Sequence, residues 1–380
     1  MNAKRGFLVA AAACLAAVSA AAQNPPGTSM QDTPPWTLGG TLTAQPAVSY
    51  SSELTVGTAS TLGLVFKAGG ERARAEASVE AAVLTGASAQ LAWAIAASPF
   101  ARADELLFPA AAGGAGSPDT AIAARIRTLY AKLDLEWAAF TAGRQVLNYG
   151  RGALWTPTDI FTELDLSGIS PVRRGTDAIR MVMPLGVTAG LDLAAAPTTS
   201  PGSGRYAARL SSLLGDADAA VMAARDGAGR AWLAGADFKA DLVIGFYADA
   251  VYAQPDAGGW GMVRAAAGAD WSIGDFIIAA EYYYNGGGAS ADLLYPGTHN
   301  LYGSLTWTAS QLVLLSLTGV VDLEGGAGTG TLLAQVSAAQ NADVTAYVQA
   351  GRGSGGYGRG YGAGGSSWTV GAGAGFQVKF

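Results

Sequence analysis

The chain ends in the stretch WTVGAGAGFQVKF, residues 368–380, in which every second position is apolar or small. The positions on this side are Trp368, Val370, Ala372, Ala374, Phe376, Val378 and Phe380. Successive side chains of a β-strand point to opposite faces, so the stretch predicts a strand with one apolar face. The last residue of the chain is an aromatic on that face.

The composition of the chain indicates whether such an apolar face contacts lipid or a protein core. Only 14% of the residues are charged, whereas a soluble protein carries about 25%. Much of the outer surface is therefore expected to face lipid. Beyond residue 22 the sequence has no apolar run of the roughly 18 residues that a membrane-spanning helix needs. Because lipid accepts only helices and closed barrels, the sequence predicts an all-β, transmembrane β-barrel.

The same alternation recurs upstream and gives the barrel a charged inner face. Residues 72–83 alternate small or apolar side chains with polar or charged ones, and residues 264–271 and 276–284 repeat the pattern. A membrane barrel with a wet lumen places its apolar residues outside and its charges inside. The predicted lumen-lining residues are Arg72, Arg74, Glu76, Glu80, Arg264 and Glu281.

Turn spacing predicts about 18 antiparallel strands in residues 36–380, and 16 also fit, since boundaries of this kind drift by about 2–4 residues. Short turns such as 185–186 and 240–241 alternate with longer links such as 99–120 and 146–174. This is the pattern of short periplasmic turns and long extracellular loops. Residues 87–98 count as a strand in this scheme. Residues 36–51 also have strand character: either they enter the barrel and 71–98 is one long strand, or they pack elsewhere.

The N-terminal residues predict export. Lys4 and Arg5 precede an apolar stretch that ends in small residues, which is typical of a signal peptide at 1–22. Residues 23–35 are predicted to be a proline-rich periplasmic leader. Cys14 lies within the apolar stretch, which favours a signal-peptide residue over a lipoprotein acceptor. The mature chain would then have no cysteine, which excludes disulfides, thiol catalysis and cysteine-based metal sites.

The terminal strand also resembles the signal that the barrel-assembly machinery of bacteria with an outer membrane recognises. The resemblance rests on the terminal aromatic and the alternating apolar residues before it, namely Phe376, Val378 and Phe380. It implies localisation in the bacterial outer membrane, with membrane lipid and the assembly machinery as partners. The net charge of −6 argues against a nucleic-acid partner, and a homo-oligomer stays open.

Residues 143–161 form the densest polar and aromatic cluster of the chain, and a returning segment ends in Pro184-Leu185-Gly186. The whole stretch 143–186 resembles porin-like outer-membrane barrels, including the alginate-export type, and names no substrate. Opposite charges in the long loop could fold it inward across the lumen, and an external loop of solvated ion pairs is the alternative. The pore-constriction candidates are Arg144, Arg151, Asp159, Arg173, Arg174 and Asp177. Their excess of arginine predicts a preference for anions.

A barrel of this width leaves an aqueous lumen, so the sequence predicts passive diffusion of small hydrophilic solutes through a porin-like channel. The alternatives are a plugged, structural or adhesive barrel and a hydrolase at the barrel rim. The single His299 shares a strand face with Leu301, whereas Ser304 lies on the opposite face. A lone histidine without a nucleophile argues against catalysis, and no motif predicts a metal or cofactor site.

Overall fold

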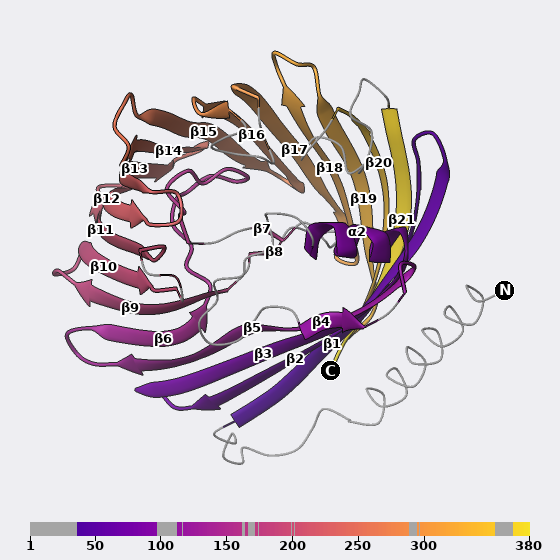
Figure 1. The fold of residues 1–380 in the computed structure, drawn as a ribbon, viewed down its shortest axis with the longest axis horizontal. Helices are drawn as coiled ribbons and strands as arrows, with labels where there is room; N and C mark the ends of the chain where they lie inside the picture. The colour runs from indigo at the N-terminus through magenta and orange to yellow at the C-terminus, as the bar shows by residue number, and fades with distance from the viewer. Residues whose placement is uncertain are drawn as a thin grey trace.

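The computed structural model describes residues 36–96, 112–115, 117–161, 164–165, 172–173, 175–198, 200, 202–288, 295, 297–353 and 368–380. The predicted signal peptide and the leader lie outside these residues. Over the described chain, antiparallel strands form a closed 18-strand barrel, seen from one end in Figure 1. No helix among these residues is long and apolar enough to cross a membrane.

The barrel strands follow one another around the wall in chain order. They are β1 (Trp36–Tyr50), β2 (Leu54–Gly69), β3 (Ala73–Gly86), β5 (Thr120–Asp134), β6 (Ala139–Gln145), β9 (Thr176–Pro184), β10 (Ala189–Ala196), β11 (Arg205–Leu214), β12 (Ala217–Asp226), β13 (Ala231–Asp241), β14 (Gly245–Pro255), β15 (Met262–Ile273), β16 (Phe276–Asn285), β17 (His299–Ser310), β18 (Val313–Asp322), β19 (Gly328–Ala339), β20 (Ala342–Arg352) and β21 (Trp368–Lys379). Three short strands lie outside this series: β4 (Ala112–Ala115), β7 (Leu164–Asp165) and β8 (Val172–Arg173).

Pairing of the first strand with the last closes the barrel. β1 and β21 are antiparallel partners, with Thr41 opposite Lys379 and Tyr50 opposite Val370. At the end of this seam the Phe380 amide donates to the Gly40 carbonyl at 3.0 Å, and the Gly40 amide donates to the Phe380 carbonyl at 2.8 Å. A Cβ atom on Gly40 would lie 2.5 Å from the Phe380 ring, so the ring covers this glycine. The predicted terminal strand is therefore confirmed.

The expected number of strands is confirmed, but its membership is corrected in two places. Residues 36–50 form β1, and the predicted strand at 87–98 is instead helix α2 (Ala87–Ala96). The segment ASAQLAWAIA is rich in alanine, the residue with the highest helix propensity, and has one β-branched residue. Gly57 of β2 makes room for this helix, since a Cβ there would lie 2.5 Å from the Ser88 hydroxyl.

The two faces of the wall differ as the alternation predicted. Large apolar side chains are exposed on the outside, and aromatic pairs such as Trp36 with Phe66 and Phe276 with Trp307 stack there at 6.4 and 5.7 Å. Two-residue turns at 215–216 and 274–275 connect strands at the end of the barrel where Phe380 lies. Gly215 and Gly274 have φ values of 66° and 54°, which glycine adopts without steric conflict.

A pair of neighbouring residues on β18 tests the assignment of faces. Leu317 is 52% exposed and points outward, whereas Thr318 faces the lumen. We expect Leu317→Lys to lower the free energy of unfolding by about 2–4 kcal/mol, the usual effect of a lysine near the bilayer midplane. Thr318→Lys should change it little. Urea titrations of the barrel refolded in lipid vesicles would measure both, and equal losses would contradict the assignment.

Candidate functional site

The described residues that follow β6, numbers 146–161, lie inside the barrel (Figure 1). We call these residues the lumen loop. Leu147, Tyr149 and Phe161 are buried in one cluster with inward-facing residues of β9 to β14, among them Ala194 and Ala224. Small side chains on the wall therefore make room for large side chains of the loop. Burial raises the pKa of the Tyr149 phenol, which keeps it neutral near neutral pH.

A second cluster fixes the middle of the lumen loop against the neighbouring strands. The Trp155 ring stacks on Tyr283 of β16 at 5.1 Å. The rings of Tyr295 and Tyr302 meet it edge-on at 5.3 and 6.3 Å. Offset stacking and edge-to-face contacts are the preferred aromatic geometries, so the indole has a defined position in the lumen.

Glu281 of β16 holds the backbone of the lumen loop. Its carboxylate accepts three hydrogen bonds, from the amides of Ala153 at 2.5 Å, Leu154 at 3.2 Å and Trp155 at 2.7 Å. The side chain is 1% exposed. Hydrogen bonds to an ionised acceptor are about twice as strong as neutral ones, so this residue is the main polar tether of the loop.

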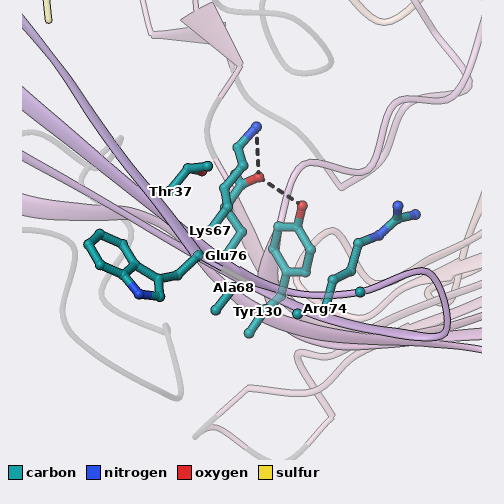
Figure 2. A pocket seen from close by; sticks show the side chains of 10 residues that line it. Thr37, Lys67, Ala68, Arg74, Glu76 and Tyr130 are labelled. Atoms are coloured by element: carbon teal, nitrogen blue, oxygen red, sulfur yellow. Dashed lines mark hydrogen bonds and ion pairs between the residues drawn. The ribbon is translucent and has the colours of Figure 1, made fainter. Parts of the chain in front are cut away.

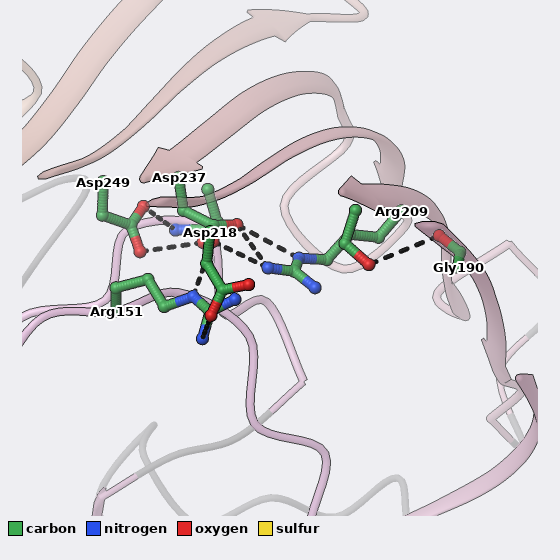
Figure 3. A network of polar contacts seen from close by, with 8 residues as sticks. Arg151, Gly190, Arg209, Asp218, Asp237 and Asp249 are labelled. Carbon is green, nitrogen blue, oxygen red and sulfur yellow. Dashed lines mark hydrogen bonds and ion pairs between the residues drawn. The ribbon is translucent and has the colours of Figure 1, made fainter. Parts of the chain in front are cut away.

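Two more carboxylates of the wall extend the tether (Figure 3). Asp249 of β14 accepts from the Thr158 amide at 3.0 Å and from the Thr158 hydroxyl at 2.9 Å. Asp237 of β13 lies between two arginines, at 3.2 Å from Arg151 of the loop and 2.7 Å from Arg209 of β11. The loop is thus bound to three strands of one arc of the wall, β13, β14 and β16.

Two glycines allow the lumen loop to approach this wall. A Cβ on Gly150 would lie 2.0 Å from Oδ2 of Asp249, and Gly150 has a φ of +84°. A Cβ on Gly152 would lie 1.8 Å from the Trp155 carbonyl oxygen. Neither position accepts a side chain without displacement of the loop.

Comparisons with known proteins place this architecture among solved barrels. No protein-family model and no curated protein sequence matches the chain. OccAB4 of Acinetobacter baumannii matches the fold with a TM-score of 0.59 at 8% identity, over 92% of this chain and 99% of that one. The chain has a porin-like outer-membrane barrel fold. OpdK of Pseudomonas aeruginosa, crystallised with vanillate, matches with a TM-score of 0.57 at 9% identity, over 90% and 99% of the two chains. The outer membrane protein OprD of Pseudomonas aeruginosa gives 0.56 at 7%, over 91% and 94%.

Two predicted constriction residues of this porin-like barrel lie in its wall. Arg144 and Asp177 form a two-bonded ion pair at 2.8 and 2.9 Å, with side chains 2% and 5% exposed. Arg144 lies opposite Leu129, and Asp177 shares a strand face with the outward Ile179. Both charges therefore join β6 to β9 and are buried in the wall, and their role in solute passage stays a prediction.

The other constriction candidates lie in or beside the lumen loop. Arg173 of β8 contacts Asp159 at 2.6 Å. Arg151 also lies 3.6 Å from Asp218 of β12, in addition to Asp237. Arg174 lies outside the described residues. The structure thus brings two of the predicted arginines next to carboxylates inside the barrel, and their role in solute passage stays a prediction.

Three of the predicted lumen-lining residues lie on the inner wall near β5. Glu76 lies 3.6 Å from Lys67 and accepts a hydrogen bond from Tyr130 at 3.2 Å (Figure 2). Arg74 and Glu80 share its side of β3, and Glu80 pairs with Arg125 of β5 at 2.6 Å. This part of the wall is a mixed network of both signs.

The remaining lumen-lining candidates have three different environments. Arg72 lies in the turn between β2 and β3, directly before β3, and its role as a lumen-lining residue stays a prediction. Glu281 faces inward but is covered by the lumen loop. Arg264 of β15 lies opposite the inward Asn285 and, among the described residues, has no carboxylate partner. Within the part of the chain that the structure describes, no neighbouring carboxylate neutralises its charge.

His299 lies on the outside of the barrel. Its Nδ1 atom is 2.5 Å from the Tyr282 hydroxyl, and its Nε2 atom is 3.9 Å from Glu324. Ser304 belongs to the inner face of the same strand. The two residues therefore lie on opposite sides of the wall, which disfavours the rim hydrolase. No group of three metal-ligating side chains occurs in the described part of the chain.

The sequence interpretation missed Asp249 and the function of Asp237 as a loop anchor. Both carboxylates sit among alternating small residues, in ADA of β14 and GAD of β13. The alternation that selected Glu281 could also have selected Asp249 as inward-facing. The alternation could not show that the lumen loop, about ninety residues earlier in the chain, binds Asp249, because this contact depends on the closed barrel.

Proposed function

We propose that the chain is a porin-like channel of the bacterial outer membrane through which small hydrophilic solutes diffuse passively. The observation that supports this proposal most directly is the 18-strand wall with its lumen loop. Glu281, Asp249 and Asp237 tether this loop to one arc of the wall. Eighteen strands enclose a space too wide for side chains to fill, so a loop held on one side narrows a pore. Outer-membrane lipid and the assembly machinery are the proposed partners, and the barrel acts alone or as a homo-oligomer.

Planar-bilayer recording of the purified protein tests this function. Discrete conductance steps would support the channel. Bilayers that stay sealed at high protein load would favour the plugged, structural or adhesive barrel instead. The match to OpdK, crystallised with vanillate, supports including small organic carboxylates among the test solutes.

We further propose that arginines near the lumen loop favour anions. Arg173 and Arg151 lie in the loop region, and Arg264 lies on the wall without a neutralising partner among the described residues. Selectivity follows the charges that line the narrow part of a pore, whatever the net charge of the chain. The sequence predicted the same preference; Arg151 and Arg173 come from its constriction set and Arg264 from its lumen-lining set, whereas Arg144 and Asp177 are buried in their ion pair.

Replacing Arg173 or Arg264 tests the preference. We expect Arg173→Ala and Arg264→Gln each to shift the reversal potential in a salt gradient toward cations, with a roughly severalfold change in permeability ratio, because one unit charge leaves the pore. Arg225→Gln is the matched control. Its guanidinium lies over the outward Trp232 at 5.4 Å, so the same charge change occurs outside the lumen. Equal shifts in all three variants would contradict the assignment.

A further inference from the structure

The charges of the inner wall are unevenly distributed around the barrel. On β3 to β16, inward-facing carboxylates and arginines recur along the strands, as the Glu80, Asp192 and Asp237 pairs illustrate. On β17 to β21 and β1, the described inward positions carry charge only at the strand ends. Asp322 lies at one end, and Asp343 with Lys379, 3.0 Å apart, lies at the other.

Hydroxyl and amide side chains occupy many of the inward positions in the middle of these six strands, and Leu314, Val320 and Leu333 lie among them. We call this inner surface the hydroxyl–amide arc. The strand register places Thr318 opposite Thr331, Thr331 opposite Gln349, and Gln335 opposite Thr345. All five are partly exposed, and they alternate with outward residues such as Leu332 and Val348.

The seam of the barrel continues this surface. Thr43 and Thr61 hydrogen-bond to each other across β1 and β2. On β21 the inward positions 371, 373 and 375 are glycines, and the Tyr347 ring lies across one of them, because a Cβ on Gly373 would be 2.5 Å from that ring. The wall here is smooth, uncharged and carries an aromatic ring laid along it.

The tethers of the lumen loop lie outside this arc, and the nearest of them, Glu281 of β16, is on the strand next to β17. The carboxylates that hold it belong to β13, β14 and β16, and its contact with the arc is at one end, where Trp155 meets Tyr302 of β17. Val320 of β18 also packs against the cluster of Trp155, whereas the buried apolar clusters of the described residues include none from β19 to β21 or from β1.

We propose that the hydroxyl–amide arc is a path for uncharged, polyhydroxylated solutes of the sugar type, a proposal that rests on the channel function above. Hydroxyls and amides both donate and accept hydrogen bonds, as sugar hydroxyls do. A hydrogen bond between neutral groups contributes little net free energy, because it replaces hydrogen bonds that both groups make with water. A row of such groups along the wall therefore lets a solute bind and then leave. Ions are drawn to the charged arc opposite, where the field is stronger.

Block of ion current by neutral sugars tests the proposal. The recording uses the full-length protein in planar bilayers, with glucose, sucrose and raffinose as probes and a polyethylene glycol of matched size as the crowding control. We expect the sugars to interrupt the current at lower concentration than the polymer. The triple variant Thr331→Val, Gln335→Leu and Thr345→Val should weaken this block about tenfold, since three neutral hydrogen bonds are lost at nearly constant volume.

Thr141→Val is the matched control, because it removes an inward hydroxyl from the charged arc, opposite Arg180. It should leave the sugar block unchanged. Equal block by sugar and polymer, or an unchanged block in a triple variant that still conducts, would overturn the sugar path and leave the channel intact. A wild-type protein that gives no ion current at all would overturn the channel itself.

Discussion

Replacing Glu281 with alanine is expected to release the lumen loop and to raise the single-channel conductance. Three backbone amides, those of Ala153, Leu154 and Trp155, lose their common acceptor. Hydrogen bonds to a charged group contribute about 1.5–3 kcal/mol each, so the loop loses several kcal/mol of docking free energy. The wall itself keeps all of its strand pairing. We therefore expect larger and noisier current steps from a barrel that is still folded.

Planar-bilayer conductance measures this effect, with circular dichroism as the check on folding. Glu281→Gln adds a sharper test, because the amide nitrogen of glutamine cannot accept the loop amides while the side-chain size is kept. Asp343→Asn is the matched control, since it removes an inward carboxylate whose partners are Lys379 and Ser337, both on strands outside the loop. An unchanged conductance in both Glu281 variants would show that the aromatic contacts alone hold the loop.

Deleting Phe380 should produce the second large effect, a loss of assembled barrel. The deletion removes both backbone hydrogen bonds to Gly40 and the ring that covers this glycine. Two such bonds contribute about 0.5–1.5 kcal/mol each, which lowers the equilibrium for seam closure about tenfold. In cells the loss should be greater, because the terminal aromatic is the predicted signal for the assembly machinery.

The fraction of heat-modifiable, folded protein in outer-membrane preparations measures this loss. Phe380→Tyr keeps an aromatic ring and both backbone bonds, so it should assemble as the wild type does. Refolding of the deleted chain into detergent separates the two contributions. Normal refolding with failed assembly in cells would assign the effect to recognition, and normal assembly in cells would contradict the prediction.

Much of the barrel was predictable because its strands obey one local rule. Each strand must present an apolar face to lipid, so alternation alone located β15, β16 and β21 and the direction of Glu281. Alternation does not identify the secondary structure of alanine-rich segments, because alanine fits either face of a strand and also favours a helix. Residues 87–96 are the case in point, and their helical state depends on the space above Gly57.

The candidate site was less predictable, since it depends on contacts between distant parts of the chain. The sequence selected Arg144 and Asp177 as opposite charges near a loop, and they are indeed partners. Their depth in the wall depends on the register of β6 with β5, which places Arg144 opposite Leu129. Spacing along the chain does not reveal that register, because a shift of one residue would reverse the face.

The order of the tethers along the chain has a consequence for biogenesis. The partners of the lumen loop come later in the sequence than the loop itself, by 86 residues for Arg151 with Asp237, 91 for Thr158 with Asp249 and 126 for Trp155 with Glu281. Long intervening segments make such contacts entropically unfavourable until the strands between them are in place. The lumen loop can therefore be fully tethered only after β16 has joined the wall, so the narrowing of the pore belongs to a late stage of assembly, shortly before β17 to β21 close the barrel against β1.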